Sequence, residues 1–107
     1  MFEPTFCSGL ADLASRYRSF IVDQWGVLHD GARPYAAALD CLAELRRSGK
    51  RIVLLSNSGK RTGVNRARLA EIGIEPSLYD AVVTSGEATW QALAARTEPF
   101  FAALGRR

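Results

Sequence analysis

The chain has 107 residues, of which 48% are hydrophobic and 23% charged, and its formal net charge is +3. This length allows one small domain or part of one, and the composition is typical of a globular chain and argues against disorder. No apolar run approaches the roughly 18 residues that cross a bilayer. The acidic N-terminus has no basic residues, which argues against a secretory signal.

The small positive charge suits an anionic ligand such as phosphate and does not require nucleic acid. The densest basic segment, residues 60–68, lacks the interleaved aromatic residues of a single-strand binder, so a solvated helix face is the favoured interpretation. Cys7 and Cys41 are too few and too far apart for a zinc site, and they predict reduced, buried thiols in a cytoplasmic protein. We expect neither a nucleic-acid partner nor a membrane partner.

The first half of the chain shows a helix pattern, a strand pattern and a second helix pattern. Apolar residues recur with helical spacing over residues 10–17, and Ser8 is placed to cap that helix. Residues 20–23 begin with an aromatic and two β-branched residues, which is typical of a short buried strand. A second helix is predicted through residues 38–45, and Gly49 follows it as the expected stop signal.

The second half repeats the alternation of strand and helix. Continuous apolar runs predict strands near residues 51–55 and 81–84, with a helix over residues 64–72 between them and another helix after the third strand. Three aromatic residues of the C-terminal part are predicted to lie in the core: Trp90, Phe100 and Phe101.

Strands that alternate with helices and are apolar throughout predict an α/β fold. We expect a three-layer αβα, Rossmann-like parallel sheet within residues 1–107, with right-handed crossovers that cover both faces of the sheet. All three strands end in small polar or acidic residues, so the carboxyl edge of the sheet is predicted to be polar. In open α/β sheets, ligands bind at that edge.

The first strand ends in Asp23, and Gly26 then lets the backbone turn sharply and approach a bound group closely. Taken alone, Asp23 could simply cap a turn. The second strand ends in Ser56, Asn57 and Ser58, whose hydroxyls, amide and backbone N–H groups suit a phosphate at a strand-to-helix turn. The alternative is that this segment caps the following helix.

A carboxylate that faces phosphate donors can act as a nucleophile and form an aspartyl-phosphate, which water then cleaves. Two anions repel each other, so such a site requires a divalent cation, and oxygen ligands favour Mg²⁺. His29, the one histidine, is interpreted as a hydrogen-bonded loop residue rather than a base. The phosphate-binding P-loop motif and the Gly-x-Gly-x-x-Gly motif are both absent.

These residues resemble the haloacid dehalogenase (HAD) superfamily of phosphohydrolases, in its NagD-like branch. The segment Asp23-Gln24-Trp25-Gly26-Val27 matches the family's opening motif, Leu54-Leu55-Ser56-Asn57 matches its second, and residues 84–89 are similar to the branch's third strand-to-helix loop. The resemblance covers residues 20–95. It implies that Asp23 is the nucleophile and a Mg²⁺ ligand and that the backbone carbonyl of Trp25 is a second ligand. It also implies that Ser56, Asn57 and Gly26 contact the phosphoryl group of a small phosphorylated metabolite.

Two departures from the family pattern matter. Position 25 is Trp where phosphatases of this family have an Asp that protonates the leaving oxygen, a role worth roughly 10²–10⁴-fold in rate. We therefore expect poor hydrolysis of alkyl phosphates and a smaller loss for acyl or aryl phosphates.

The family's later Lys, its acidic cluster and its cap domain also have no counterpart here, so we expect an incomplete HAD core with little activity alone. The first strand would then be an open edge that invites self-association. The alternative hypotheses are a non-catalytic binding or assembly module derived from a HAD core, or, with a poor fit, a receiver domain.

Overall fold

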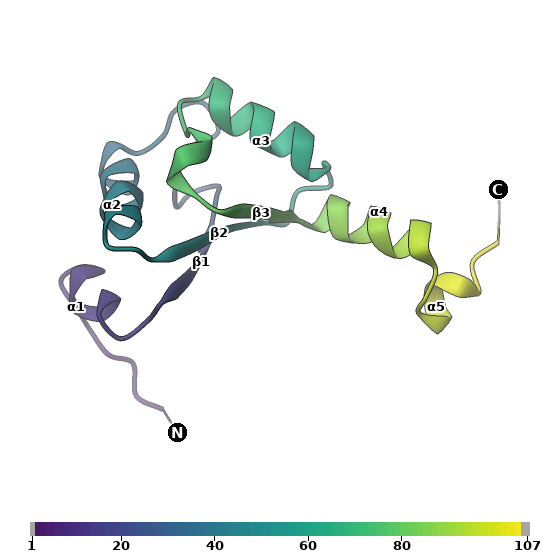
Figure 1. Cartoon of the computed structure of the whole chain (residues 1–107), viewed down its shortest axis with the longest axis horizontal. Coiled ribbons are helices and arrows are strands. Elements are labelled where there is room, and N and C mark those ends of the chain that lie inside the picture. The colour runs from purple at the N-terminus through teal and green to yellow at the C-terminus, as the bar shows by residue number, and fades with distance from the viewer. Residues whose placement is uncertain (1, 106–107) are drawn as a thin grey trace.

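The computed structural model describes residues 2–105 and shows one three-stranded parallel sheet with helices between the strands (Figure 1). The strands are β1 (Ser19–Asp23), β2 (Arg51–Ser56) and β3 (Ala81–Thr84), in the order β1-β2-β3. The helices are α1 (Ala11–Ala14), α2 (Ala36–Arg47), α3 (Thr62–Glu71), the 3₁₀ helix η1 (Pro76–Leu78), α4 (Ser85–Ala95) and α5 (Pro99–Ala102). The α/β class is confirmed, and each strand lies within one residue of its predicted position.

Helices cover one face of the sheet. In the order β1-β2-β3, both crossover connections run in the same direction across the sheet. Because such connections are right-handed, they place α2 and α3 on the same face of the sheet. Ile52, Leu54 and Val82 point toward these helices and are buried, whereas Ile21 on the opposite face is 74% exposed. Within residues 2–105, the prediction of two covered faces is therefore met on one face only. The apolar runs could not predict which faces are covered, because this depends on the order of the strands in the sheet.

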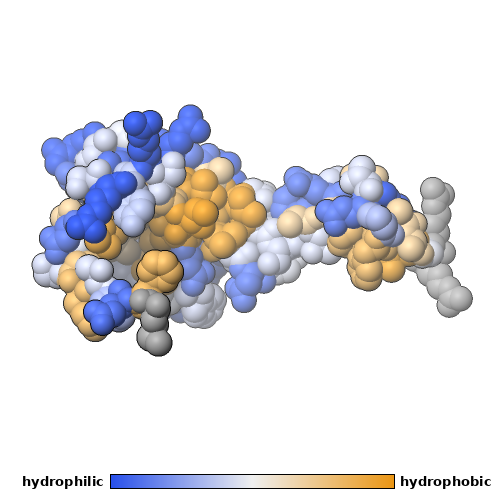
Figure 2. Space-filling view, turned by 90° about the horizontal axis from the view of Figure 1, so that it is seen from below, coloured by the Kyte–Doolittle hydropathy of each residue, from blue (hydrophilic) through white to orange (hydrophobic). Residues whose placement is uncertain are grey.

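The opposite face of the sheet is apolar and open. Its side chains come from all three strands and are exposed: Ile21, Leu55 and Val83. Figure 2 views the molecule from this side and shows a continuous apolar area in the middle of the body. We call these three residues the open face.

The core lies between the covered face and the two crossover helices. It contains Leu28, Leu42, Leu45, Ile52, Leu54, Leu69, Ile74, Tyr79 and Val82. Burying one side chain of this size contributes about 1.5–3 kcal/mol, so this small cluster holds α2 and α3 on the sheet. Helix α2 ends as the sequence predicts, with Gly49 at a positive φ of 77° just beyond it.

Three local predictions are wrong. Helix α1 is four residues long rather than eight, and Ser8 does not cap it; instead both the N–H and the hydroxyl of Ser8 donate to the carboxylate of Asp12, at 3.0 Å each. Cys7 is exposed and Cys41 is half-buried, so neither is a fully buried thiol. The short N-terminal segment packs against little of the sheet, which explains the short helix and the exposure of Cys7, whereas Cys41 lies on α2 at the margin of the core.

The C-terminal helices extend away from the sheet (Figure 1). Helix α4 contacts the sheet through β3, and α5 packs against α4. Trp90 and Phe100 are therefore 49% and 69% exposed, and Phe101 is half-buried but outside the core cluster, so the prediction that these three residues lie in the core is wrong. No helix within residues 2–105 has the length and apolar composition needed to cross a membrane.

Candidate functional site

Asp23 and Ser56 lie at the same edge of the sheet, on neighbouring strands. Asp23 pairs in register with Leu55, so Ser56 is one residue further along β2. Because side chains alternate along a strand, Asp23 points to the same side as Ile21, whereas Ser56 points to the helix-covered side. The carboxylate of Asp23 is exposed, and its Oδ1 accepts a hydrogen bond from the N–H of Gln24 at 2.9 Å. A carboxylate in this position is accessible to a ligand at the edge.

The turn after β2 offers hydroxyl groups. The Oγ of Ser56 accepts from the N–H of Ser58, and the Oγ of Ser58 accepts from the N–H of Lys60, both at 3.2 Å. Each hydroxyl keeps its own O–H to donate. Asn57 between them is exposed. The turn can therefore present several donors to an anion.

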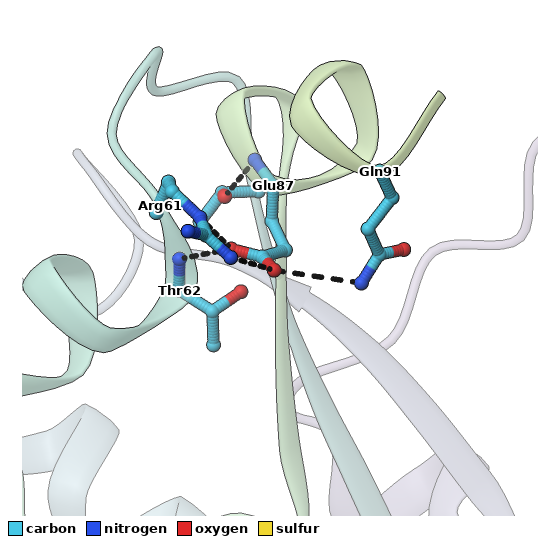
Figure 3. A network of polar contacts seen from close by, with 5 residues as sticks. Arg61, Thr62, Glu87 and Gln91 are labelled. Carbon is cyan, nitrogen blue, oxygen red and sulfur yellow. Dashed lines mark hydrogen bonds and ion pairs between the residues drawn. The ribbon is translucent and has the colours of Figure 1, made fainter. Parts of the chain in front are cut away.

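A carboxylate from α4 occupies the N-terminus of α3. The N-cap of α3 is Arg61, and the next N–H, that of Thr62, donates to Oε2 of Glu87 at 3.2 Å. The guanidinium of Arg61 donates to both oxygens of Glu87 at 3.0 Å, and Gln91 also approaches this carboxylate (Figure 3). The alternative that residues 56–58 cap this helix is therefore wrong. An anion bound here would use the turn itself rather than the helix N-terminus.

We call this arrangement of Arg61, Thr62 and Glu87 the clasp. The ion pair with Arg61 and the N–H of Thr62 hold the pKa of Glu87 below its ordinary value. The guanidinium also lies 3.7 Å from the ring centroid of Trp90, a cation–π contact. The N–H of Glu87 donates to Oγ1 of Thr84 at 3.0 Å, which caps α4. Sequence reasoning missed the clasp because its partners are 26 positions apart; the Thr84–Glu87 capping pair was the one local signal.

The turn after β1 is held by internal hydrogen bonds. The buried amide of Gln24 exchanges two hydrogen bonds with Asn65 of α3, at 3.0 and 3.1 Å. Gly26 has a φ of 81°, as its predicted sharp turn requires, and its N–H donates to the carbonyl of His29 at 2.8 Å. Gly26 thus shapes the turn, and its contact with a phosphate stays a prediction.

His29 is buried and stabilises the turn through a hydrogen bond, as the sequence indicated. Its Nδ1 accepts from the N–H of Gly31 at 3.0 Å, so in the neutral ring the proton is on Nε2. Burial is the main cause that lowers the pKa of His29, and Arg68 adds to it against the opposing effect of Asp30. A neutral ring of this kind supports a structural role.

A pocket of 460 Å³ lies between this turn and α3. Its lining includes Trp25, Ser56, Ser58, Lys60 and Val64, so it joins the hydroxyl-bearing turn to an exposed indole. Asp23 is not among the lining residues, although the next residue, Gln24, is. The carboxylate therefore lies beside the mouth of the pocket rather than inside it.

The donors for a metal ion are few. No group of three or more His, Cys, Asp or Glu side chains within the described residues could hold one. Asp23 and the backbone carbonyl of Trp25 supply oxygen donors, which match Mg²⁺ in kind. Mg²⁺ is usually bound through one or two carboxylates and substrate phosphates and keeps several waters. The residues fit this ion in chemistry, and they provide fewer protein ligands than a dedicated site.

Comparison with known proteins agrees with this architecture. The family model for haloacid dehalogenase-like hydrolases matches residues 20–105. The chain belongs to this family. A crystal structure of a haloacid dehalogenase-like hydrolase from Brucella suis 1330 is similar over 84% of the chain, with 34% sequence identity and a TM-score of 0.78. A hypothetical protein from Pyrococcus horikoshii OT3 matches over 78% of the chain, with 28% identity and a TM-score of 0.60.

The chain of this haloacid dehalogenase-like protein spans about a third of those relatives, 34% of the first and 32% of the second. No curated protein matches it. Family membership therefore confirms the resemblance on which the residue assignments were based. The roles of Asp23, Ser56, Asn57, Gly26 and Trp25 stay predictions.

Proposed function

We propose that this chain contributes the nucleophile-bearing part of a phosphohydrolase that acts on small phosphorylated metabolites. The observation that carries the proposal is the exposed carboxylate of Asp23 at the end of β1, with Ser56 one register position further along the neighbouring strand β2. A nucleophile and a phosphate donor on neighbouring strand ends are what such a reaction needs.

In the proposed reaction, an oxygen of Asp23 attacks phosphorus and the bond to the leaving oxygen breaks, which gives an aspartyl-phosphate. Water then cleaves that anhydride and regenerates the carboxylate with release of phosphate. Ser56 and Asn57 donate hydrogen bonds to the phosphoryl oxygens. Mg²⁺, held by Asp23 and the carbonyl of Trp25, would offset the repulsion between carboxylate and phosphate.

Trp25 decides which substrates can react. Indole cannot protonate a leaving oxygen, so an alkyl phosphate loses a contribution of roughly 10²–10⁴-fold. An acyl or aryl phosphate loses less, because its leaving group departs as a stable anion. Trp25→Asp should therefore raise hydrolysis of alkyl phosphates more than that of aryl phosphates.

A second candidate is a non-catalytic binding module derived from the same core. Trp25 in place of an acid and the open face both favour it. A cytoplasmic location agrees with either candidate and is supported by the two free cysteines.

The test is release of 4-nitrophenolate from 4-nitrophenyl phosphate, with and without Mg²⁺, at high protein concentration. We expect slow release that depends on Mg²⁺ and is lost in Asp23→Asn. Asp40→Asn is the matched control, because it removes an exposed carboxylate of α2 far from β1 in sequence and should leave the rate unchanged. Release that persists in Asp23→Asn removes this residue from the mechanism, and no release by the unaltered chain favours the binding module.

A further inference from the structure

The indole of Trp25 is held in place although it is 70% exposed. Its edge meets the ring of His29, with centroids 5.7 Å apart and planes at 70°. The six-membered part of the indole rests on the backbone of Gly31, where a Cβ atom would lie only 2.3 Å from Cη2. Gly31 also has a φ of 96°, so a glycine both permits the turn and leaves room for the ring. A fixed, exposed aromatic ring is a surface ready for a planar ligand, since little side-chain freedom is lost on binding.

The pocket connects this indole to the turn after β2. Trp25 and Val64 form an apolar part of the lining, whereas Ser56, Ser58 and Lys60 form a polar part. Its volume of 460 Å³ falls in the range of small-molecule sites, about 300–1,000 Å³. The lining therefore suits a ligand with a flat apolar part and an anionic part.

Lys60 supplies the cation for the anionic part. No ion pair within the described residues involves its ammonium group. Arg68, the other cation of the pocket, is already engaged, because it donates to Glu71 at 3.1 Å and to the carbonyl of Gly31 at 3.0 Å. That second bond ties the Gly31 turn to α3, and both residues line the pocket.

We propose that this pocket is a subsite for an aromatic phosphate monoester, with the aryl ring on Trp25 and the phosphoryl group toward Ser56 and Lys60. The inference rests on the proposed function and names its substrate class. The chemistry of position 25, which is part of the proposed function, leads to the same class without reference to the pocket. When the bond between phosphorus and the aryl oxygen breaks, the electron pair stays on that oxygen as an aryloxide, which needs no acid in the site and takes its proton from water. Trp25 thus takes the place of the general acid and also contacts the aromatic leaving group that needs no acid.

The test measures binding in an Asp23→Asn chain, which cannot form the aspartyl-phosphate and so keeps the ligand intact. Phenyl phosphate, ethyl phosphate and inorganic phosphate are titrated into the ¹⁵N-labelled protein, and dissociation constants are taken from NMR shifts. A well-placed aromatic contact predicts that phenyl phosphate binds about 2- to 12-fold tighter than ethyl phosphate. Trp25→Ala should reduce this ratio to about one, and Trp25→Phe should restore part of it.

Two further variants separate stacking from charge. Trp90→Phe is the matched control, because Trp90 lies on α4 outside the pocket, and it should leave the ratio unchanged. Lys60→Met should weaken all three ligands by a similar factor. Equal affinities for phenyl and ethyl phosphate, or a preference that survives Trp25→Ala, would overturn the aryl subsite and leave the proposed function standing. Failure of all three phosphates to bind would refute both.

Discussion

Gly86, at the start of α4, lies against the backbone of the turn that carries Ser58. A Cβ atom at position 86 would lie 2.2 Å from the carbonyl oxygen of Gly59 and 2.6 Å from that of Lys60. To restore an ordinary contact of 3.4 Å, the turn must retreat by about 1.2 Å. The obstacle is backbone rather than a flexible side chain, so Gly86→Ala displaces the turn as a whole. It also disturbs the hydrogen bond from the N–H of Gly86 to the carbonyl of Ser58, which measures 3.0 Å.

The expected cost has two parts. Overpacking of this kind costs about 1–3 kcal/mol, and the loss of one hydrogen bond adds about 0.5–1.5 kcal/mol. The free energy of unfolding should therefore fall by about 1.5–4.5 kcal/mol, a large share of the roughly 5–15 kcal/mol typical of a small domain. The measurement is urea unfolding followed by far-ultraviolet circular dichroism, with linear extrapolation to water.

Gly63 provides the matched control. It lies in α3, where a Cβ would meet nothing within 4 Å, so Gly63→Ala should raise the free energy of unfolding by about 0.5–1 kcal/mol through helix propensity. Replacement of glycine by alanine is thus expected to lower the free energy of unfolding at position 86 and to raise it at position 63. A Gly86→Ala chain whose free energy of unfolding stays within about 0.5 kcal/mol of the unaltered protein would refute the described contact between α4 and the turn.

Three other predictions test the ion pair, the core and the open face. Because Arg61 and the N–H of Thr62 lower the pKa of Glu87, the charged carboxylate stabilises the fold above its ordinary pKa of 4.5, and this contribution is lost as the pH falls through the lowered pKa. Melting temperatures between about pH 6 and pH 3 should then fall more steeply in the unaltered chain than in Glu87→Gln, and parallel curves would contradict the pairing. Leu54→Ala, at a fully buried position of the central strand, should cost about 2–5 kcal/mol in urea unfolding, and a loss below about 1 kcal/mol would contradict its place in the core. The sedimentation coefficient should rise with protein concentration and lose that dependence in Ile21→Lys, because a lysine on the edge strand blocks pairing; a coefficient constant in the unaltered chain would count against self-association.

The strands and the end of α2 could be predicted from the sequence because their signals are local. A continuous apolar run that ends in Asp23 or Ser56 needs no distant partner to be recognised, and Gly49 marks the end of a helix by its own conformational freedom. The same holds for the placement of Asp23 and Ser56 at one edge, since the ends of parallel strands necessarily meet there.

The features that could not be predicted depend on contacts between distant segments. Strand order decides which face the helices cover, and apolar runs do not contain that order. Trp90 looks like a core residue by hydrophobicity, yet α4 leaves the sheet and the ring packs under the guanidinium of Arg61 instead. The ion pair between Arg61 and Glu87 likewise joins two helix starts that no local pattern connects.

The clasp has a mechanical consequence for α4 and α5. Helix α4 has 11 residues and projects from the sheet, and its root is fixed to the turn after β2 through Arg61 and Glu87 (Figures 1 and 3). A helix of that size is about 16 Å long, so a tilt of about 10° at its root moves its far end by about 3 Å. The position of α5 relative to the sheet therefore depends on the geometry of the Arg61–Glu87 ion pair, because α5 packs against α4 and α4 contacts the sheet through β3.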